Sequence, residues 1–114
     1  ASSFIIYGNN FRIDGKRLIR CIFVNQSILS FNNLTISNGG TNNASEILFG
    51  GGMFILGHSI VSLSNIRFHD NFATQGGGLY ISSDCQVAIV NSMFLSNNAT
   101  EYGGGAVVGS NNNS

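Results

Sequence analysis

The sequence predicts an all-β fold built as a solenoid, in which each repeat of the chain forms one coil. A Gly-Gly-Gly triplet recurs at residues 50–52, 76–78 and 103–105, and the two spacings differ by only one position. A nearly constant period of this length is typical of architectures in which one repeat is one turn. Apolar and polar residues alternate with period two between the triplets, which indicates strands, and no segment has the period of an amphipathic helix.

Each repeat is expected to contain two strands. The first is a short apolar segment after a triplet, and the second is a longer alternating segment with an Asn inside it. The spacing of these Asn residues predicts about four coils of about 23–32 residues each. The first strands are residues 53–56, 79–81 and 106–108, and the second strands are residues 6–13, 29–36, 61–68 and 87–94, with Asn10, Asn33, Asn65 and Asn91 in equivalent places.

Gly and Asn lie between these strands, where a turn needs positive φ. Stacking of the four equivalent Asn residues predicts a ladder of side-chain amides along one corner. The longest spacing predicts a loop insertion near residues 39–49. A chain of 114 residues with this repeat is expected to be a single domain, residues 1–114.

Two short motifs carry a family resemblance. Residues 104–107, Gly-Gly-Ala-Val, match a Gly-Gly-Ala-aliphatic motif, from which the other two triplets depart at the alanine. Residues 68–71 and 94–97 match a Phe-x-x-Asn motif. Over residues 28–108 the repeats resemble those of polymorphic outer-membrane proteins, and the coils resemble right-handed parallel β-helices of the pectin-lyase-like type. The resemblance implies the fold, but adhesins, passenger domains and polysaccharide enzymes share it, so it implies no single function.

The composition limits the classes of partner. Charged residues make up 9% of the chain and the formal net charge is zero, so nothing predicts binding to nucleic acid or to an anionic membrane. There is no apolar run of membrane-spanning length, and a membrane span is not expected. There is no signal peptide either, and we interpret the chain as a mature or excised piece.

N-glycosylation signals point to the secretory pathway. We predict N-linked glycans, and no other cofactor, on a protein that is extracellular or at the cell surface. The alternative is that turns rich in Asn and Ser produce such signals by chance. The five Asn-x-Ser/Thr sequences begin at Asn25, Asn33, Asn43, Asn98 and Asn112.

Catalysis is not predicted. Polysaccharide enzymes that resemble this fold need clustered carboxylates or a calcium site, and the five acidic residues form no pair on a strand. We therefore predict no catalytic, cofactor-binding or metal-binding residues. Cys21 and Cys85 are about two coils apart and are expected to be separate thiols, although a disulfide stays open.

The ends of the solenoid are the predicted sites of self-association. We find no capping segment with a polar outer face, and the last repeat is expected to lack its second strand. An aromatic column could form a second contact on the outer face, although a shift of the strand phase by one residue would bury it. The end residues are Phe4, Ile5, Ile6, Ala106, Val107 and Val108, and the outer-face column is Phe23, Phe54 and Tyr80.

These features predict a structural protein, a subunit of an extracellular and glycosylated fibre that forms by head-to-tail stacking of β-helices. The alternative is a β-helical adhesin or passenger segment at the cell surface that binds a glycan or a protein. A polysaccharide lyase or hydrolase is the third possibility.

Overall fold

The computed structural model describes residues 3–43 and 45–109, and this part of the chain consists of strands and turns without a helix. The prediction of an all-β fold is confirmed. In chain order the strands are β1 (Ser3–Asp14), β2 (Ile22–Asn25), β3 (Ile28–Ser37), β4 (Met53–Leu56), β5 (Ile60–His69), β6 (Phe72–Gln75), β7 (Leu79–Ser82), β8 (Gln86–Val90), β9 (Met93–Leu95), β10 (Asn98–Tyr102) and β11 (Ala106–Gly109).

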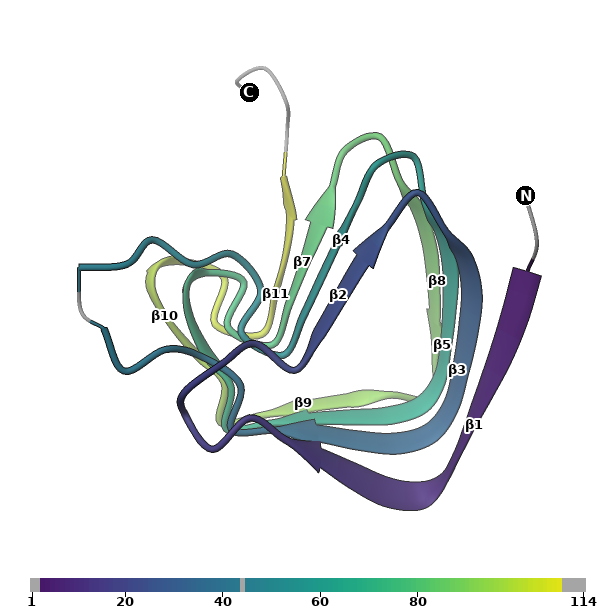
Figure 1. Cartoon of the computed structure of the whole chain (residues 1–114), viewed down its shortest axis with the longest axis horizontal. Coiled ribbons are helices and arrows are strands. Elements are labelled where there is room, and N and C mark those ends of the chain that lie inside the picture. The colour runs from purple at the N-terminus through teal and green to yellow at the C-terminus, as the bar shows by residue number, and fades with distance from the viewer. Residues whose placement is uncertain (1–2, 44, 110–114) are drawn as a thin grey trace.

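The strands form three sheets, and every pairing between them is parallel. One sheet has the order β1-β3-β5-β8, with β9 also paired to β5. A second has the order β2-β4-β7-β11, and a third contains β6 and β10. Figure 1 looks along the direction in which equivalent strands stack, so that the strands of each sheet lie behind one another. Pairing therefore joins strands that are one repeat apart, as the glycine spacing predicts.

The core lies between the first two sheets. The inner face of β5 contributes Val61, Leu63, Ile66 and Phe68, and β4 contributes Met53 and Ile55; none is more than 2% exposed. In β5 polar side chains such as Ser62, Ser64 and Arg67 occupy the outward positions, whereas those of β4 are apolar, since successive residues of a strand point to opposite faces. Burial of this apolar surface is the main force that holds the parallel sheets together.

The long strands β3 and β5 bend at their internal Asn. Asn33 and Asn65 both have φ of 56°, in the left-handed region that Asn tolerates better than most residues. The predicted amide ladder at this corner is wrong: the four Asn side chains are exposed, and no hydrogen bond joins them within the described residues. The left-handed turn directs these side chains to the outside, while the residues on either side of the turn face the core.

The ladder lies instead at the Phe-x-x-Asn motif. Asn71 is buried, and its Nδ2 donates to Asn97 Oδ1 at 2.9 Å and to Ile36 O at 3.0 Å. Its Oδ1 accepts from the backbone N–H of Gly39 at 2.9 Å, and Asn97 Nδ2 donates to Phe68 O at 2.9 Å. Three consecutive repeats are thereby joined, because the amides satisfy backbone groups that the turn leaves unpaired.

Strand β1 differs from its neighbours at the corner. Its pairing with β3 shifts register between Tyr7 and Phe11, so β1 contains two more residues there than β3 does. Asn9 and Asn10 within this bulge have φ of 54° and 64°. Figure 1 shows that β1 consequently runs outside the path that β3, β5 and β8 share.

In the described residues no strand follows β11, as expected for a last repeat that begins at its triplet, but the chain can equally be divided at the longer strands. Each strand of the second sheet follows a strand of the first sheet along the chain, so that β11 follows β8 and β9 just as β7 follows β5. Divided in this way, the repeat begins with the longer strand and ends with the short strand after the triplet. The triplets set the period correctly, but a period does not determine where a repeat begins.

The predicted insertion, residues 39–49, lies between β3 and β4, and its described residues, 39–43 and 45–49, contain no strand. It projects to the side of the stacked sheets in Figure 1. At its end, Phe49 forms an isolated parallel bridge with Gln75. Leu48 N donates to Thr74 Oγ1 at 3.0 Å, which fixes the return of the loop beside β6.

Candidate functional site

The two ends of the stacked sheets are the candidate site. Strands β1 and β2 are the outermost strands at one end, and β8, β9, β10 and β11 are outermost at the other. In the described part of the chain each of them pairs with another strand on one side only. An edge of this kind presents a row of unpaired backbone N–H and C=O groups, which can pair with another strand.

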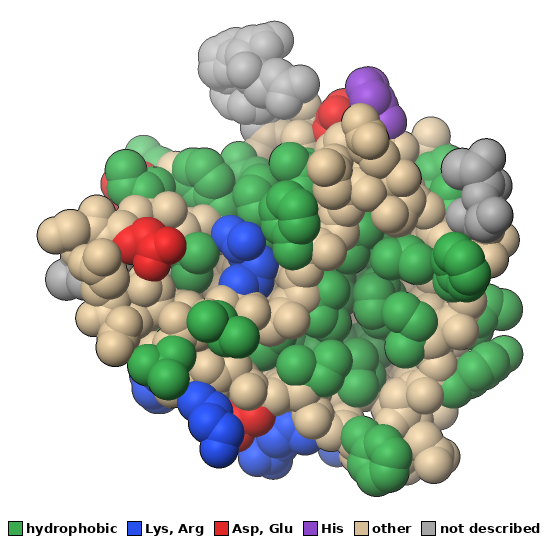
Figure 2. All heavy atoms as spheres, in the orientation of Figure 1, with side chains coloured by type: hydrophobic (Ala, Val, Ile, Leu, Met, Phe, Trp, Pro, Cys, Tyr) green, Lys and Arg blue, Asp and Glu red, His purple; other side chains and the backbone are tan. Residues whose placement is uncertain are grey.

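The end formed by β1 exposes the inner face of the fold. By the observed register, Phe4, Ile6 and Phe11 occupy the same rows as inward-facing residues of β3. Ile6 is 40% exposed and Phe11 70% exposed, whereas their partners in β3, Phe31 and Leu34, are buried. Figure 2, in which this end faces the viewer, shows hydrophobic side chains gathered across it. Exposed apolar patches of this kind are typical of surfaces that contact a protein partner, a membrane or a ligand.

The opposite end also exposes core positions. Val108 in β11 is 70% exposed, although its partner Ile81 in β7 is buried. Ile89 in β8 is 40% exposed above buried Leu63. Phe94 stacks on Phe68 with ring centroids 4.7 Å apart and an interplanar angle of 4°. Both ends therefore present strand edges together with an open apolar core.

The predicted self-association residues belong to these two ends. Phe4, Ile5 and Ile6 lie in β1, and Ala106, Val107 and Val108 lie in β11. Ile5 and Val107 occupy the outward positions of their strands, by the register with Ser30 and Tyr80. The structure thus places the two predicted segments at opposite ends of the stack and in different sheets.

The margin of the β1 end is polar. Asp14 accepts a hydrogen bond from the backbone N–H of Lys16 at 2.8 Å and one from Asn38 Nδ2 at 3.3 Å. The bond from the Lys16 N–H is the main cause that lowers the pKa of the Asp14 carboxyl below its ordinary value. Arg12, Lys16 and Arg17 are exposed beside it. This margin resembles the polar rim that surrounds the apolar centre of a protein interface.

The predicted aromatic column lies on the outer face of the second sheet, where Phe23, Phe54 and Tyr80 are paired in one row. The insertion covers part of it: the Phe49 ring stacks on Tyr80 at 5.0 Å and meets Phe54 edge-on at 6.1 Å. Phe23 is exposed, whereas Phe54 and Tyr80 are half-buried. The column is therefore largely a contact within the chain, and little of it is left for a partner.

Arg20 anchors this contact. Its guanidinium donates to Phe49 O at 2.9 and 3.2 Å and to Gly50 O at 3.0 Å, and it lies 5.1 Å from the centre of the Phe54 ring. Burial lowers the pKa of Arg20 from its ordinary value. Sequence reasoning missed the roles of Arg20 and Phe49, because neither residue type recurs at the equivalent position of the other repeats.

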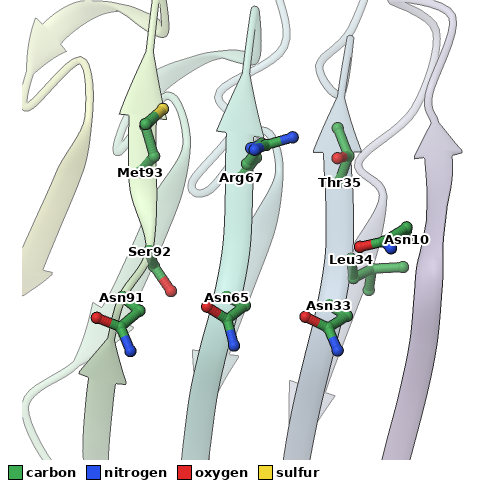
Figure 3. A pocket seen from close by; sticks show the side chains of 9 residues that line it. All are labelled: Asn10, Asn33, Leu34, Thr35, Asn65, Arg67, Asn91, Ser92 and Met93. Atoms are coloured by element: carbon green, nitrogen blue, oxygen red, sulfur yellow. The ribbon is translucent and has the colours of Figure 1, made fainter.

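The Asn corner forms a groove on the outside of the first sheet. It has a volume of about 400 Å³ and is lined mainly by polar residues of β3, β5 and residues 91–92, together with Asn10 of β1 and the apolar Leu34 and Met93. Figure 3 shows Asn33, Asn65 and Asn91 side by side with the same orientation, and Arg67 beyond them. The groove thus presents a row of side-chain amides to solvent, each with a donor and an acceptor.

The structure describes four of the five glycosylation signals. Asn25 lies at the end of β2, Asn33 in the groove, Asn43 in the insertion and Asn98 at the start of β10. All four residues are exposed, and Asn43 Oδ1 accepts from Ser45 N at 3.0 Å in a local turn. Asn112 lies outside the described residues.

Cys21 and Cys85 are both free thiols packed against the core. The acidic residues lie with separate polar partners. Each carboxylate has a partner of its own: Asn38 and Lys16 for Asp14, Thr41 for Glu46, His69 for Asp70, His58 for Asp84 and Gln75 for Glu101. Within residues 3–43 and 45–109, no three His, Cys, Asp or Glu residues are grouped to hold a metal ion.

Comparison of the chain with protein-family models, with curated proteins and with solved structures returned no match. A search of the described residues found no helix with the length and apolar character to cross a membrane. Any function proposed for the chain therefore depends on its own geometry.

Proposed function

We propose that the protein is the structural subunit of an extracellular fibre, built from right-handed parallel β-helices of about four coils that stack head to tail. The fold part of the proposal is supported by the three parallel sheets, in which strands one repeat apart pair in register. Right-handed winding is supported by the strong preference of parallel strands for right-handed crossover connections. The resemblance to β-helix repeats points to the same architecture.

The observation that carries the functional part is the exposure of core positions at both ends. Phe4 and Phe11 at one end and Val108 at the other continue rows that are buried in the middle of the stack. Contact between two different ends is heterologous, and a heterologous contact that does not close into a ring produces a filament. Self-association of this kind buries the exposed apolar rows and satisfies the strand edges at once.

Glycosylation and an extracellular location are part of the proposal. Exposure of Asn25, Asn33, Asn43 and Asn98 leaves each side chain accessible to the enzyme that attaches the glycan. Mass spectrometry of the native protein before and after enzymatic removal of N-glycans would test this. Absence of any mass change would overturn the glycan assignment and leave the fibre proposal in place.

Electron microscopy of the native protein tests the fibre proposal directly, and the concentration dependence of assembly gives its strength. Phe4→Lys places a charge in the proposed contact at a residue that is 63% exposed in the single copy, so we expect a folded protein that assembles at least about tenfold less readily. Ile47→Lys is the matched control, because Ile47 in the insertion is 74% exposed and carries the same change of charge. Monodisperse wild-type particles at high concentration would contradict the proposal.

The Asn groove favours a second candidate, a surface adhesin that binds a neutral glycan. The row of exposed amides in Figure 3 provides paired donors and acceptors of the kind that hydroxyl groups need. Asn65→Gly and Asn91→Gly remove amides but keep a residue that tolerates positive φ. Loss of binding to a glycan array in these variants, with discrete particles in the microscope, would favour the adhesin over the fibre.

The described carboxylates are not paired with one another, so no observation favours the third possibility, a polysaccharide lyase or hydrolase, over the first two.

A further inference from the structure

The strand register continues unchanged through the second sheet and along each of the two arms of the first sheet on either side of its corner. In the first sheet Phe4 pairs with Leu29, Leu29 with Val61 and Val61 with Val87. In the second sheet the row that begins at Ile22 ends at Ala106 by the same logic. The first and last members of a row thus occupy equivalent places in the repeat, and they lie at opposite ends of the molecule.

We infer that copies of the chain join with this register continued, so that β8 and β9 of one copy pair with β1 of the next and β11 pairs with β2. The inference rests on the proposed head-to-tail assembly and assigns its partner surfaces residue by residue. Parallel pairing of both sheets satisfies backbone groups at the edges of all five of these strands in one contact. The inner pairs across the junction are Val87 with Phe4, Ile89 with Ile6, Phe94 with Ile13, Ala106 with Ile22 and Val108 with Val24.

In three of the six inner rows of this junction a large side chain faces a smaller one. Phe4 at one end faces the smaller Val87 at the other, and Ile22 faces Ala106. Phe11 is in the row of Leu34 and Ile66, which continues to Ser92, whose Oγ accepts a hydrogen bond from Ile66 N. A large residue opposite a small one keeps the total volume near that of the buried layers, and this is what close packing of a core requires.

The bulge in β1 is compatible with the junction. It lies at the corner, where β8 and β9 are also separated by Asn91 and Ser92, which belong to neither strand. The two arms of β1 already pair with β3 on either side of the bulge, over residues 3–7 and 11–14. The same two arms are in place to meet β8 and β9 of another copy. A contact between two like ends would instead require antiparallel strands, and it would close as a dimer.

Disulfide trapping in the assembled protein tests the register. Ile5 and Ala88 are exposed, face outward and are predicted partners across the junction, and Tyr7 and Val90 are a second such pair. Four mixtures of variants, each with one added cysteine, combine Ile5→Cys or Tyr7→Cys with Ala88→Cys or Val90→Cys. Partners in register lie about 4.8 Å apart, whereas partners displaced by two residues lie about 8 Å apart, beyond the roughly 7 Å limit for a disulfide.

We expect the Ile5→Cys with Ala88→Cys mixture and the Tyr7→Cys with Val90→Cys mixture to form linked dimers about tenfold faster than the two crossed mixtures. Wild-type protein is the control for Cys21 and Cys85, which are native thiols. Faster linkage in the crossed mixtures, or linkage of Ile5→Cys to itself, would overturn the register. Fibres in the microscope would in that case still support the proposed assembly. Protein that neither assembles nor forms linked dimers in any mixture would overturn both the register and the fibre proposal.

Discussion

At the scale of single residues, Asn71 shows how a buried polar group determines a turn. The side chain is 1% exposed, and its amide binds Gly39 N, Ile36 O and Asn97 Oδ1. Two of these partners belong to the preceding repeat and one to the next. A buried backbone N–H or C=O that loses its partner carries the full cost of desolvation, so the contribution of this residue comes from the groups it satisfies.

Replacement of Asn71 by Ala should therefore lower the free energy of unfolding by about 2–4 kcal/mol, because Gly39 N and Ile36 O lose their partner in a buried site. Urea unfolding of the variant measures this change. Asn42→Ala is the control, since Asn42 is exposed in the insertion and its loss should change stability by less than about 0.5 kcal/mol. Equal effects of the two substitutions would show that the amide ladder contributes little.

The two thiols give a prediction about pH. Burial raises the pKa of the Cys21 thiol, whose Sγ lies 3.4 Å from Ser37 O, and burial also raises the pKa of Cys85. Because the thiolate is the reactive form, labelling at about pH 8 should be at least about tenfold slower in the folded protein than in urea. A raised pKa in the folded state stabilises the fold below the ordinary thiol pKa of 9.0, and this contribution is lost as the pH rises through the folded value. Equal labelling rates with and without urea would contradict the prediction.

At the scale of elements, the glycine triplets allow neighbouring turns to approach closely. A Cβ on Gly51 would clash with Phe72 O and lie 2.7 Å from Gly77 O, and both oxygens are backbone atoms of the next repeat. A Cβ on Gly105 would meet nothing closer than the Phe94 side chain, at 3.7 Å. Gly51→Ala should therefore lower the free energy of unfolding by about 3 kcal/mol, whereas Gly105→Ala should leave it unchanged or slightly higher. Thermal unfolding of both variants checks this, and a stable Gly51→Ala protein would show that the turns can separate.

The same elements show what the sequence could predict. Triplet spacing and period-two alternation predicted the strands and the parallel stacking, because both depend on local residues that recur in each repeat. The position of the amide ladder could not be derived from spacing, because the separation of Asn65 from Asn91 equals that of Asn71 from Asn97. Only the backbone conformation decides which pair faces inward. The contact of Arg20 with the insertion is non-local and occurs once, so no repeated pattern predicts it.

At the scale of the whole molecule, the described chain extends 36 × 34 × 20 Å, with the strands stacked along the short dimension. Because few repeats lie between the two ends, a large share of the inward-facing apolar side chains belongs to an outermost strand. In the proposed fibre, single-copy stability and end-to-end assembly would consequently depend on the same kind of contact between strands. To attribute assembly to the stacking of ends, a substitution is needed that weakens assembly without lowering the stability of the single copy.

Gly105→Ala provides that separation. A Cβ on Gly52 would lie 2.5 Å from Gly78 O, and a Cβ on Gly78 would lie 2.6 Å from Gly105 O, so each glycine of this row contacts the backbone of the next repeat. If copies stack in the same register, a Cβ on Gly105 would meet the backbone carbonyl of Cys21 of the next copy, since Cys21 precedes Ile22 in the row of Gly52 and Met53. Gly105→Ala should then fold as stably as the wild type but assemble at least about tenfold less readily. Sedimentation over a range of concentrations measures this difference, and undiminished assembly of the variant would place the contact between copies elsewhere on the molecule.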